Sequence, residues 1–261
     1  MRKTLREVRS QEKILMYGPP KAGKTYAVCS MMKACIDGGN QVFYINTDNG
    51  LKSTFMEFFG DEAERYIDKV IYYHVENVDE VATITEDIKK SYSQNDLVVI
   101  DMLSDIHLMA QFKMLEKLVQ QCEVVEYISD ASIDNTKFGM LNSQNWIYAK
   151  KIDALVSYGL VVWLNCTVVG ITQAQSIEHD KIHKNEKVLD KFEMVGYKPK
   201  GFFDYLHRFN TILYLGEFIK DNDISKFFII LGDRGNQNLY KRFNFESNFW
   251  EKYKEYRGVQ R

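Results

Sequence analysis

Eight residues near the N-terminus constrain the fold of this chain more than any other feature. The segment Gly18-Pro-Pro-Lys-Ala-Gly23-Lys24-Thr25 fits the pattern G-x-x-x-x-G-K-S/T. It follows an apolar run at 13–17, which is typical of a strand buried on both faces. It precedes a segment from 24 to 36 in which apolar residues recur at helical spacing. A strand, a glycine-bounded loop and a helix in this order predict a phosphate-binding loop.

The residue types in this loop suit a nucleoside triphosphate. Glycines let backbone N–H groups converge on phosphate oxygens, and the helix N-terminus adds the positive end of its dipole. We expect Lys24 to span the β- and γ-phosphates and Thr25 to supply a magnesium ligand. An ordinary strand–turn–helix connection is a weak alternative. The residues expected to contact the nucleotide are Gly18, Pro19, Pro20, Lys21, Ala22, Gly23, Lys24, Thr25 and Tyr26.

Strand-like and helix-like segments alternate along most of the chain. The expected strands cover 13–17, 42–45, 70–74, 97–100, 160–164, 210–215 and 224–231. The expected helices cover 24–36, 51–59, 79–92, 103–127 and 138–158, with a polar turn at 130–135. Such alternation predicts an α/β fold with βαβ crossovers and a mainly parallel sheet covered by helices on both faces. The last two strands predict a C-terminal β-hairpin.

Composition bounds the organisation of the chain. A length of 261 residues with 45% hydrophobic residues is enough for one full core. We expect an N-terminal segment at 1–12, a core at 13–242 and a charged aromatic tail at 243–261. No apolar run approaches the roughly 20 residues of a membrane span, and no signal peptide is evident. These features predict a soluble, cytoplasmic protein without a membrane partner. The cysteines form no C-x-x-C pair, which favours buried free thiols.

A net charge of −2 offers no general attraction to nucleic acid, so a DNA contact would need a local patch. The polar segment 173–200 is the candidate, since loops of this length are usually functional. Acidic residues alternate with its lysines, so a solvated lid and a DNA-contacting loop both remain open. Phe202 and Phe203 could stack on bases, although such a pair is more often core. The lysines of the segment are Lys181, Lys184, Lys187, Lys191, Lys198 and Lys200.

Asp101 directly follows the apolar run 97–100. A carboxylate at the C-terminal end of a buried strand can hold the magnesium ion of a nucleoside triphosphatase, so we expect Asp101 and Thr25 to be the metal ligands. A cap for the following helix is the weaker alternative. Asp105 is expected to be a solvated or capping side chain.

The attacking water needs a carboxylate, and Met102 rather than an acid follows Asp101. Asp48, just after the strand at 42–45, is the candidate, because parallel strands end at one edge of the sheet. The sequence Asp48-Asn49-Gly50 is also a turn signal. From spacing alone, the catalytic and turn-forming interpretations are even.

These motifs together resemble the RecA-like ATPases over about residues 12–240. The resemblance implies magnesium-dependent ATP hydrolysis. It also puts Asp48 where the family has a water-positioning glutamate, which favours the catalytic role. The family's fourth strand ends in Asn-Gln. Here Asn165 matches the Asn and Cys166 replaces the Gln, so Asn165 or Thr167 is the expected γ-phosphate sensor and Cys166 a buried thiol.

The overall pattern looks most like the core-only RecA-like ATPases of phages and archaeal viruses, which are linked to single-strand annealing and recombination. The features are the helix from Lys137, the segment 199–204 and Asp233-Arg234-Gly235. The resemblance implies single-stranded DNA binding, a homo-oligomeric ring or filament, and location in the host cytoplasm if the chain is viral. A single-stranded DNA-binding protein is a compatible partner. Arg234 would reach the neighbouring subunit's nucleotide, although Gly232 replaces the family's lysine; a solvated turn residue is the alternative.

Two other functions remain open for this chain. One is a viral genome-packaging or helicase motor ATPase, which would translocate on duplex DNA as a strict ring. The other is a P-loop phosphotransferase without DNA, which would need an acceptor pocket. DNA-stimulated phosphate release would distinguish these from a role in recombination or replication.

Overall fold

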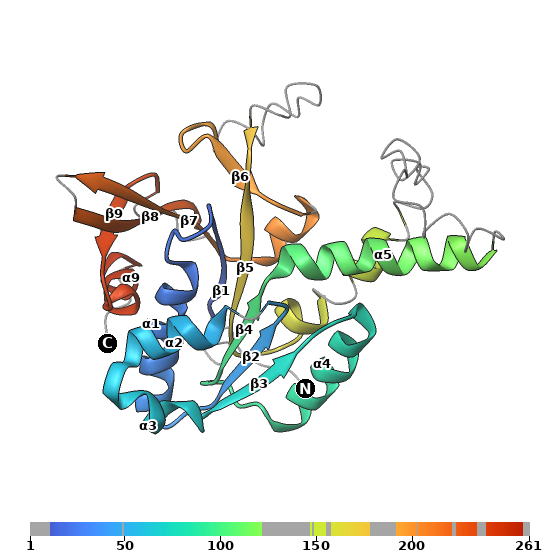
Figure 1. Ribbon diagram of the computed structural model, residues 1–261, viewed down its shortest axis with the longest axis horizontal. Helices are drawn as coiled ribbons and strands as arrows, with labels where there is room; N and C mark the ends of the chain where they lie inside the picture. Colours follow the sequence, from blue (N-terminus) through green and yellow to red (C-terminus); the bar gives the residue numbers. More distant parts are fainter. Residues whose placement is uncertain are drawn as a thin grey trace, which may run out of the picture.

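The computed structural model describes residues 11–48, 50–121, 147, 149–154, 158–177, 192–201, 203–220, 223–233 and 239–257. One sheet runs through these residues in the order β3-β2-β4-β5-β1-β7-β8-β9 (Figure 1). The pairs from β3 to β7 are parallel, whereas β8 and β9 are antiparallel. The predicted mixed α/β fold with a C-terminal hairpin is confirmed. The strands on this path are β1 Lys13–Gly18, β2 Val42–Asn46, β3 Val70–His74, β4 Leu97–Asp101, β5 Thr167–Ser176, β7 Thr211–Lys220, β8 Asp223–Asp233 and β9 Arg242–Phe245.

Helices cover both faces of the sheet, as Figure 1 shows. One face packs against α1 Lys24–Asp37, α2 Leu51–Phe59, α3 Ala63–Ile67 and α9 Phe249–Arg257. The other packs against α4 Val78–Ser91, α5 Leu103–Gln121 and the π-helical turn Tyr158–Val162. The central strands are buried on both faces because neighbouring residues belong to opposite cores. Ile14 and Met16 of β1, for example, face α1, and Leu15 and Tyr17 face the other layer.

The predicted strand at 160–164 is wrong. Residues Tyr158–Val162 form a π-helical turn, and β5 begins only at Thr167. Leu160, Val161 and Leu164 are buried against the sheet, which explains the apolar run. A short apolar run does not distinguish a strand from one buried helical turn. The consequence is a shift in which residues lie at the C-terminal end of β5.

The segment after the fourth strand also differs from the expected loop. β5 continues to Ser176, and its last residues pair antiparallel with β6 Tyr197–Pro199. The polar excursion therefore starts and ends in a short β-ribbon, which projects beyond the main sheet in Figure 1. The predicted turn at 130–135, the end of the helix predicted for 103–127 and most of the helix predicted for 138–158 lie outside the described residues.

The described part of the C-terminal tail packs against the core. β9 pairs with β8, and Phe249 and Tyr253 of α9 are buried beside α1. The domain boundaries themselves stay predictions. Of the cysteines in the described ranges, Cys29 and Cys166 are buried free thiols, as predicted, and Cys35 is partly buried. None of the helices described has the length and apolarity that a membrane span requires.

Candidate functional site

The predicted phosphate loop joins the end of β1 to the start of α1, at the edge of the sheet where the parallel strands end. Gly23 has a positive φ of 82°, and no side chain in the described ranges caps the helix after it. The N–H groups of the first turn of α1 thus remain available to an anion. Gly18 is required for a different reason: a Cβ on this residue would lie 2.2 Å from the carbonyl oxygen of Leu215 on β7.

Lys24 points back over this loop. Its Nζ donates hydrogen bonds to the carbonyl oxygens of Gly18, at 2.9 Å, and Pro19, at 2.8 Å. Burial lowers the pKa of Lys24, and the charges of Asp101 and Asp48 act in the opposite direction. The ammonium group is therefore close to the loop that would hold the phosphates. A bound phosphate would replace carbonyl oxygens with a stronger, charged acceptor.

Thr25 and Asp101 meet at the same edge. Thr25 Oγ1 donates to Asp101 Oδ2 at 3.3 Å, and the hydroxyl of Tyr44 donates to the same oxygen at 2.6 Å. Asp101 is only 4% exposed, and this burial raises the pKa of its carboxyl group to about 6. A divalent cation would relieve the cost of burying this carboxylate.

The donor set fits magnesium. Mg²⁺ prefers oxygen ligands and is usually held by one or two protein groups together with substrate phosphates and waters. A hydroxyl and a carboxylate are together here, and the described ranges contain no cluster of three or more His, Cys, Asp or Glu residues that would form a complete metal cage. The adjacent Asn46 has a buried Oδ1 with no partner among the described residues, a kind of atom that a bound water satisfies.

Two carboxylates lie near this pair. Asp48 is exposed, and its Oδ1 accepts a hydrogen bond from the N–H of Gly50 at 2.8 Å, which is the turn geometry expected of this sequence. Its charge nevertheless acts on both Lys24 and Asp101. Asp105, expected to be a solvated or capping side chain, is half-buried and accepts a hydrogen bond from Thr47 Oγ1 at 2.8 Å. Asp105 is therefore a second carboxylate oriented at this edge.

Asn165 does not lie near the phosphate loop. It precedes β5, and Val168 of that strand pairs with Lys13 at the start of β1, at the opposite edge of the sheet. The predicted nucleotide contact of Asn165 is thus wrong, as is the sensor role of Thr167. The reason is the misplaced strand. The residue of β5 that pairs with Gly18 is Gln173.

Some of the remaining predicted residues lie outside the described ranges, and others lie inside them. Arg234 and the lysines at 181, 184, 187 and 191 lie outside the described residues, as does Phe202. Asp233, which precedes Arg234, pairs with Thr211 at the edge of the sheet away from the loop. Lys200 Nζ donates to Gln173 Oε1 at 3.2 Å, a contact at the base of the β-ribbon beside the position that pairs with Gly18.

Sequence reasoning missed three residues of this edge: Tyr44, Thr47 and Gln173. The sequence offered a signal for Thr47 and Gln173, because each comes shortly after an apolar run of the kind that forms a buried strand. Thr47 also accepts a hydrogen bond from the N–H of Met102 at 2.9 Å, which ties the ends of β2 and β4 together. Tyr44 had no such signal, because an alternating tyrosine in a buried strand usually fills the core.

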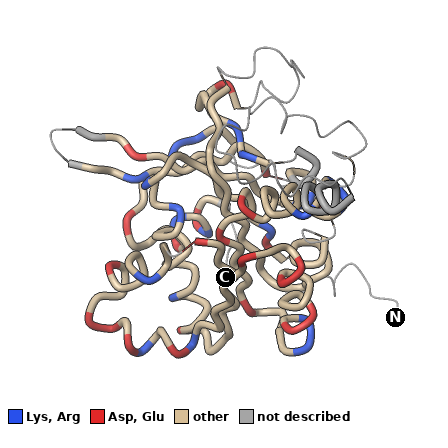
Figure 2. The backbone as a smooth tube through the Cα atoms, turned by 45° about the vertical axis from the view of Figure 1, so that its right-hand side comes forward, with Lys and Arg blue, Asp and Glu red and all other residues tan. Residues whose placement is uncertain are grey.

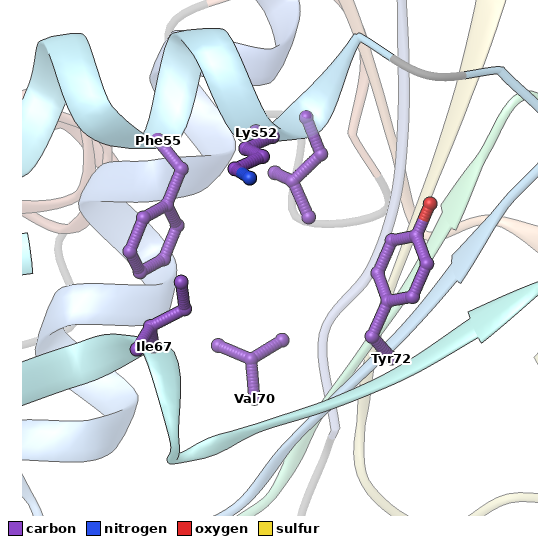
Figure 3. Close-up of a pocket in the computed structure, with 6 residues that line it drawn as sticks. Lys52, Phe55, Ile67, Val70 and Tyr72 are labelled. Carbon is purple, nitrogen blue, oxygen red and sulfur yellow. The ribbon is translucent and has the colours of Figure 1, made fainter. Parts of the chain in front are cut away.

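A hollow of about 370 Å³ lies beside this site, between α2 and β3 (Figure 3). Its walls are mainly carbon, and among its described lining residues only Lys52 has a charged side chain. Asn46 Nδ2 donates to the hydroxyl of Tyr72 on its rim at 2.8 Å. Such a hollow suits an apolar group and not a phosphate. Its lining residues are Leu51, Lys52, Phe55, Ile67, Val70 and Tyr72.

A phosphate loop, an adjacent hydroxyl–carboxylate pair and this strand order together define a RecA-like P-loop NTPase. Within that class, the chain belongs to the AAA domain family, whose sequence model matches residues 10–198. Among solved structures, the crystal structure of the RadB recombinase is similar over 90% of this chain and 87% of that chain, with 17% identity and a TM-score of 0.53. At this identity the likeness concerns the fold. No curated protein matches the chain significantly.

Replacing Asp101 with Asn is expected to stabilise the metal-free protein at neutral pH. Burial raises the pKa of Asp101 from 3.8 to about 6. The folded protein therefore binds this proton more tightly than the unfolded chain does, and the carboxylate lowers stability as pH rises from ~4 to ~6. The full effect approaches ~3 kcal/mol at ~1.4 kcal/mol per pH unit. An asparagine avoids this cost and still offers Tyr44 an acceptor.

Thermal unfolding of both proteins in a chelator, at about pH 7 and about pH 4, measures this effect. The stabilisation should be present at the higher pH and small at the lower one, where wild-type Asp101 is protonated. Asp96→Asn is a matched control, since Asp96 is also buried but directly precedes β4, at the opposite end of that strand from Asp101. An Asp101→Asn variant that is less stable than wild type at neutral pH would contradict the prediction.

Proposed function

We propose that this protein hydrolyses ATP with magnesium and couples hydrolysis to single-stranded DNA in recombination or replication. One observation carries the ATPase assignment: Lys24, Thr25 and Asp101 converge at one edge of the sheet. The DNA part of the proposal has a different basis. It rests on the β-ribbon beside Gln173 and on the similarity in fold to the RadB recombinase.

Each group at the edge has a task that its chemistry suits. Lys24 neutralises charge on the β- and γ-phosphates, and the N–H groups of the loop hold their oxygens. Thr25 and Asp101 would hold Mg²⁺, which, when bound, stabilises charge on the phosphates. A carboxylate orients the attacking water. Gln173, which pairs with Gly18 where β1 ends, would respond to the γ-phosphate.

Asp48→Asn is expected to leave ATP affinity unchanged and to lower the hydrolysis rate about 10²-fold or more, because it removes the group that orients water. Asp105→Asn is the matched comparison, since it makes the same change in the second nearby carboxylate. Single-turnover hydrolysis, with ATP affinity measured separately, decides between them. If only Asp105→Asn is slow, the water-positioning role belongs to Asp105 and the RecA-type assignment of Asp48 fails.

The DNA contact is proposed for the segment that leaves β5 at Ser176 and returns at β6. Figure 2 shows basic and acidic positions interspersed along the described backbone in that view. Lys200 contacts Gln173, which would let the base of this ribbon respond to the nucleotide. The binding is expected to be electrostatic and therefore sensitive to salt.

Neutralising Lys181, Lys184 and Lys187 together should weaken single-stranded DNA binding and flatten its salt dependence by about 0.7 in slope for each phosphate that the variant no longer neutralises. Fluorescence anisotropy with a labelled oligonucleotide across a salt series measures both quantities. Changing Lys52, Lys69 and Lys90 together is the control, because this variant removes the same charge from other surfaces. An unchanged slope in the first variant would leave the segment as a solvated lid.

The finer assignment is to the core-only RecA-like ATPases of phages and archaeal viruses, acting as a ring or filament in which Arg234 completes the neighbouring nucleotide site. Phosphate release measured with and without single-stranded DNA tests the whole proposal. Stimulation by single-stranded DNA supports it. Stimulation by duplex DNA alone would indicate a packaging or helicase motor, and phosphate transfer to an acceptor without any DNA effect would indicate a phosphotransferase.

A further inference from the structure

The side chain of Lys226 extends from β8 over the phosphate loop. The sequence around Lys226 matches no motif. Lys226 is on β8, and it faces the α1 side of the sheet together with the buried residues Phe228 and Ile230. A Cβ on Gly23 would lie 2.9 Å from Cδ of Lys226, so the aliphatic part of this side chain packs directly on the loop glycine. This contact joins positions about 200 residues apart in the sequence.

The ammonium group of Lys226 ends at the first turn of α1. Its Nζ lies 4.0 Å from the ring centroid of Tyr26, the residue that follows Thr25. Another neighbour of this ring is Phe58 of α2, at 4.9 Å between centroids in an edge arrangement. The Lys226 side chain therefore reaches from β8 over Gly23 to the helix turn whose N–H groups face the loop.

No acidic residue among those described forms an ion pair with Lys226. Its cross-strand partner on β7 is Glu217, whose side chain is exposed. A partly buried lysine with no ion pair among the described residues, next to a loop built for a polyanion, is an electrostatic arrangement that a bound phosphate completes. A cation–π contact is worth less than a charge-assisted hydrogen bond, so the ammonium can leave the ring for a phosphate oxygen.

We propose that Lys226 is a second cation of the nucleotide site, which binds a phosphate group of the nucleotide held by the same chain. The proposal rests on the nucleotide binding proposed above and adds to it a residue from β8. It differs in kind from the role expected of Arg234, which would act on the nucleotide of a neighbouring subunit. Lys226 acts within one chain, so its effect on binding does not require assembly.

Isothermal titration with ATP, ADP and inorganic tripolyphosphate tests this role. Lys226→Met keeps most of the stem that packs on Gly23 and removes the charge. It should weaken all three ligands by about tenfold, the scale of one hydrogen bond to a charged group. Lys226→Arg should bind them nearly as well as wild type does. Lys226→Gln repeats the charge removal with a polar side chain, in case the methionine disturbs the fold.

Lys254 offers a matched control. Its Nζ lies 5.7 Å from the ring centroid of Trp250 on α9, so Lys254→Met removes a similar cation–π pair away from the loop. This variant should bind the three ligands as wild type does. If Lys226→Met and Lys226→Gln also bind like wild type, the inference is wrong.

Two further outcomes distinguish a failure of the proposed role of Lys226 from a failure of the proposed nucleotide binding. If Lys226→Met weakens ATP but not tripolyphosphate, the side chain acts on the base or ribose and the phosphate role is overturned. If wild-type protein binds none of the three ligands while Lys254→Met and wild type are both folded by circular dichroism, the proposed nucleotide function itself fails.

Discussion

Lys24→Ala is expected to abolish nucleotide turnover, with a decrease of at least about 10³-fold. In the structure the Lys24 ammonium group lies over the loop, held by two loop carbonyl oxygens. Phosphoryl transfer spreads negative charge over the γ-phosphate, and a fixed cation at that point lowers the barrier. Lys226, another cation beside the loop, ends over the ring of Tyr26 and does not replace this contact.

Phosphate release by the purified variant, at saturating ATP and magnesium, measures the effect. Lys33→Ala is the control on the same helix, because Lys33 is partly exposed and its Nζ contacts Asp37 and the hydroxyl of Tyr66, away from the loop. Neither contact involves the phosphate loop, so the control should stay active. Turnover by Lys24→Ala comparable to the control would refute the assignment of the phosphate loop.

Arg234→Ala is expected to bind ATP normally and to hydrolyse it about 10³ to 10⁵ times more slowly, the contribution of an arginine supplied by a neighbouring subunit. The position of Asp233 is consistent with action between subunits. Asp233 pairs with Thr211, which pairs with Ile14, whereas the phosphate loop begins at Gly18. Four residues of strand span about 13 Å. Asp233 thus lies at the end of the sheet away from the phosphate loop of its own chain.

Mixing the two inactive variants makes this prediction specific. A mixed assembly contains sites that combine the intact loop of Arg234→Ala with the intact arginine of Lys24→Ala. These sites should restore part of the activity. Analytical ultracentrifugation must first show that the variants co-assemble. If they do and the mixture stays inactive, Arg234 either acts within its own chain or has no role in hydrolysis.

Much of the fold was predictable because strong local signals agreed with one another. The ends of α2 and β3 were predicted to the residue, since Gly50 and Gly60 flank the helix and the charged pair before Val70 precedes the strand. The error at 160–164 came from a run too short to have a period. That single error moved the apparent end of the strand from Leu164 to Ser176.

The site residues that belong to one sequence motif were predictable. The residues that only the fold brings together were harder to predict. Lys24 and Thr25 belong to the loop pattern, and Asp101 ends an obvious strand. The hydrogen bond from Tyr44 to Asp101 joins neighbouring strands, and the one from Thr47 to Asp105 joins the end of β2 to α5. Lys226 reaches Gly23 across the sheet. These partners depend on strand order, which sequence spacing does not specify.

The short ribbon formed by the end of β5 and β6 also allows the segment between Ser176 and Tyr197 to be replaced by another. Three paired positions close its base: Ala174 with Pro199, Gln175 with Lys198, and Ser176 with Tyr197. Because these pairs fix where the intervening chain leaves and returns, its length and composition can change without moving Gly18 or Gln173. Longer insertions at such a closed base add little entropic cost. One nucleotide-binding core could thus accept different target-recognition segments, in nature or by design, as interchangeable modules.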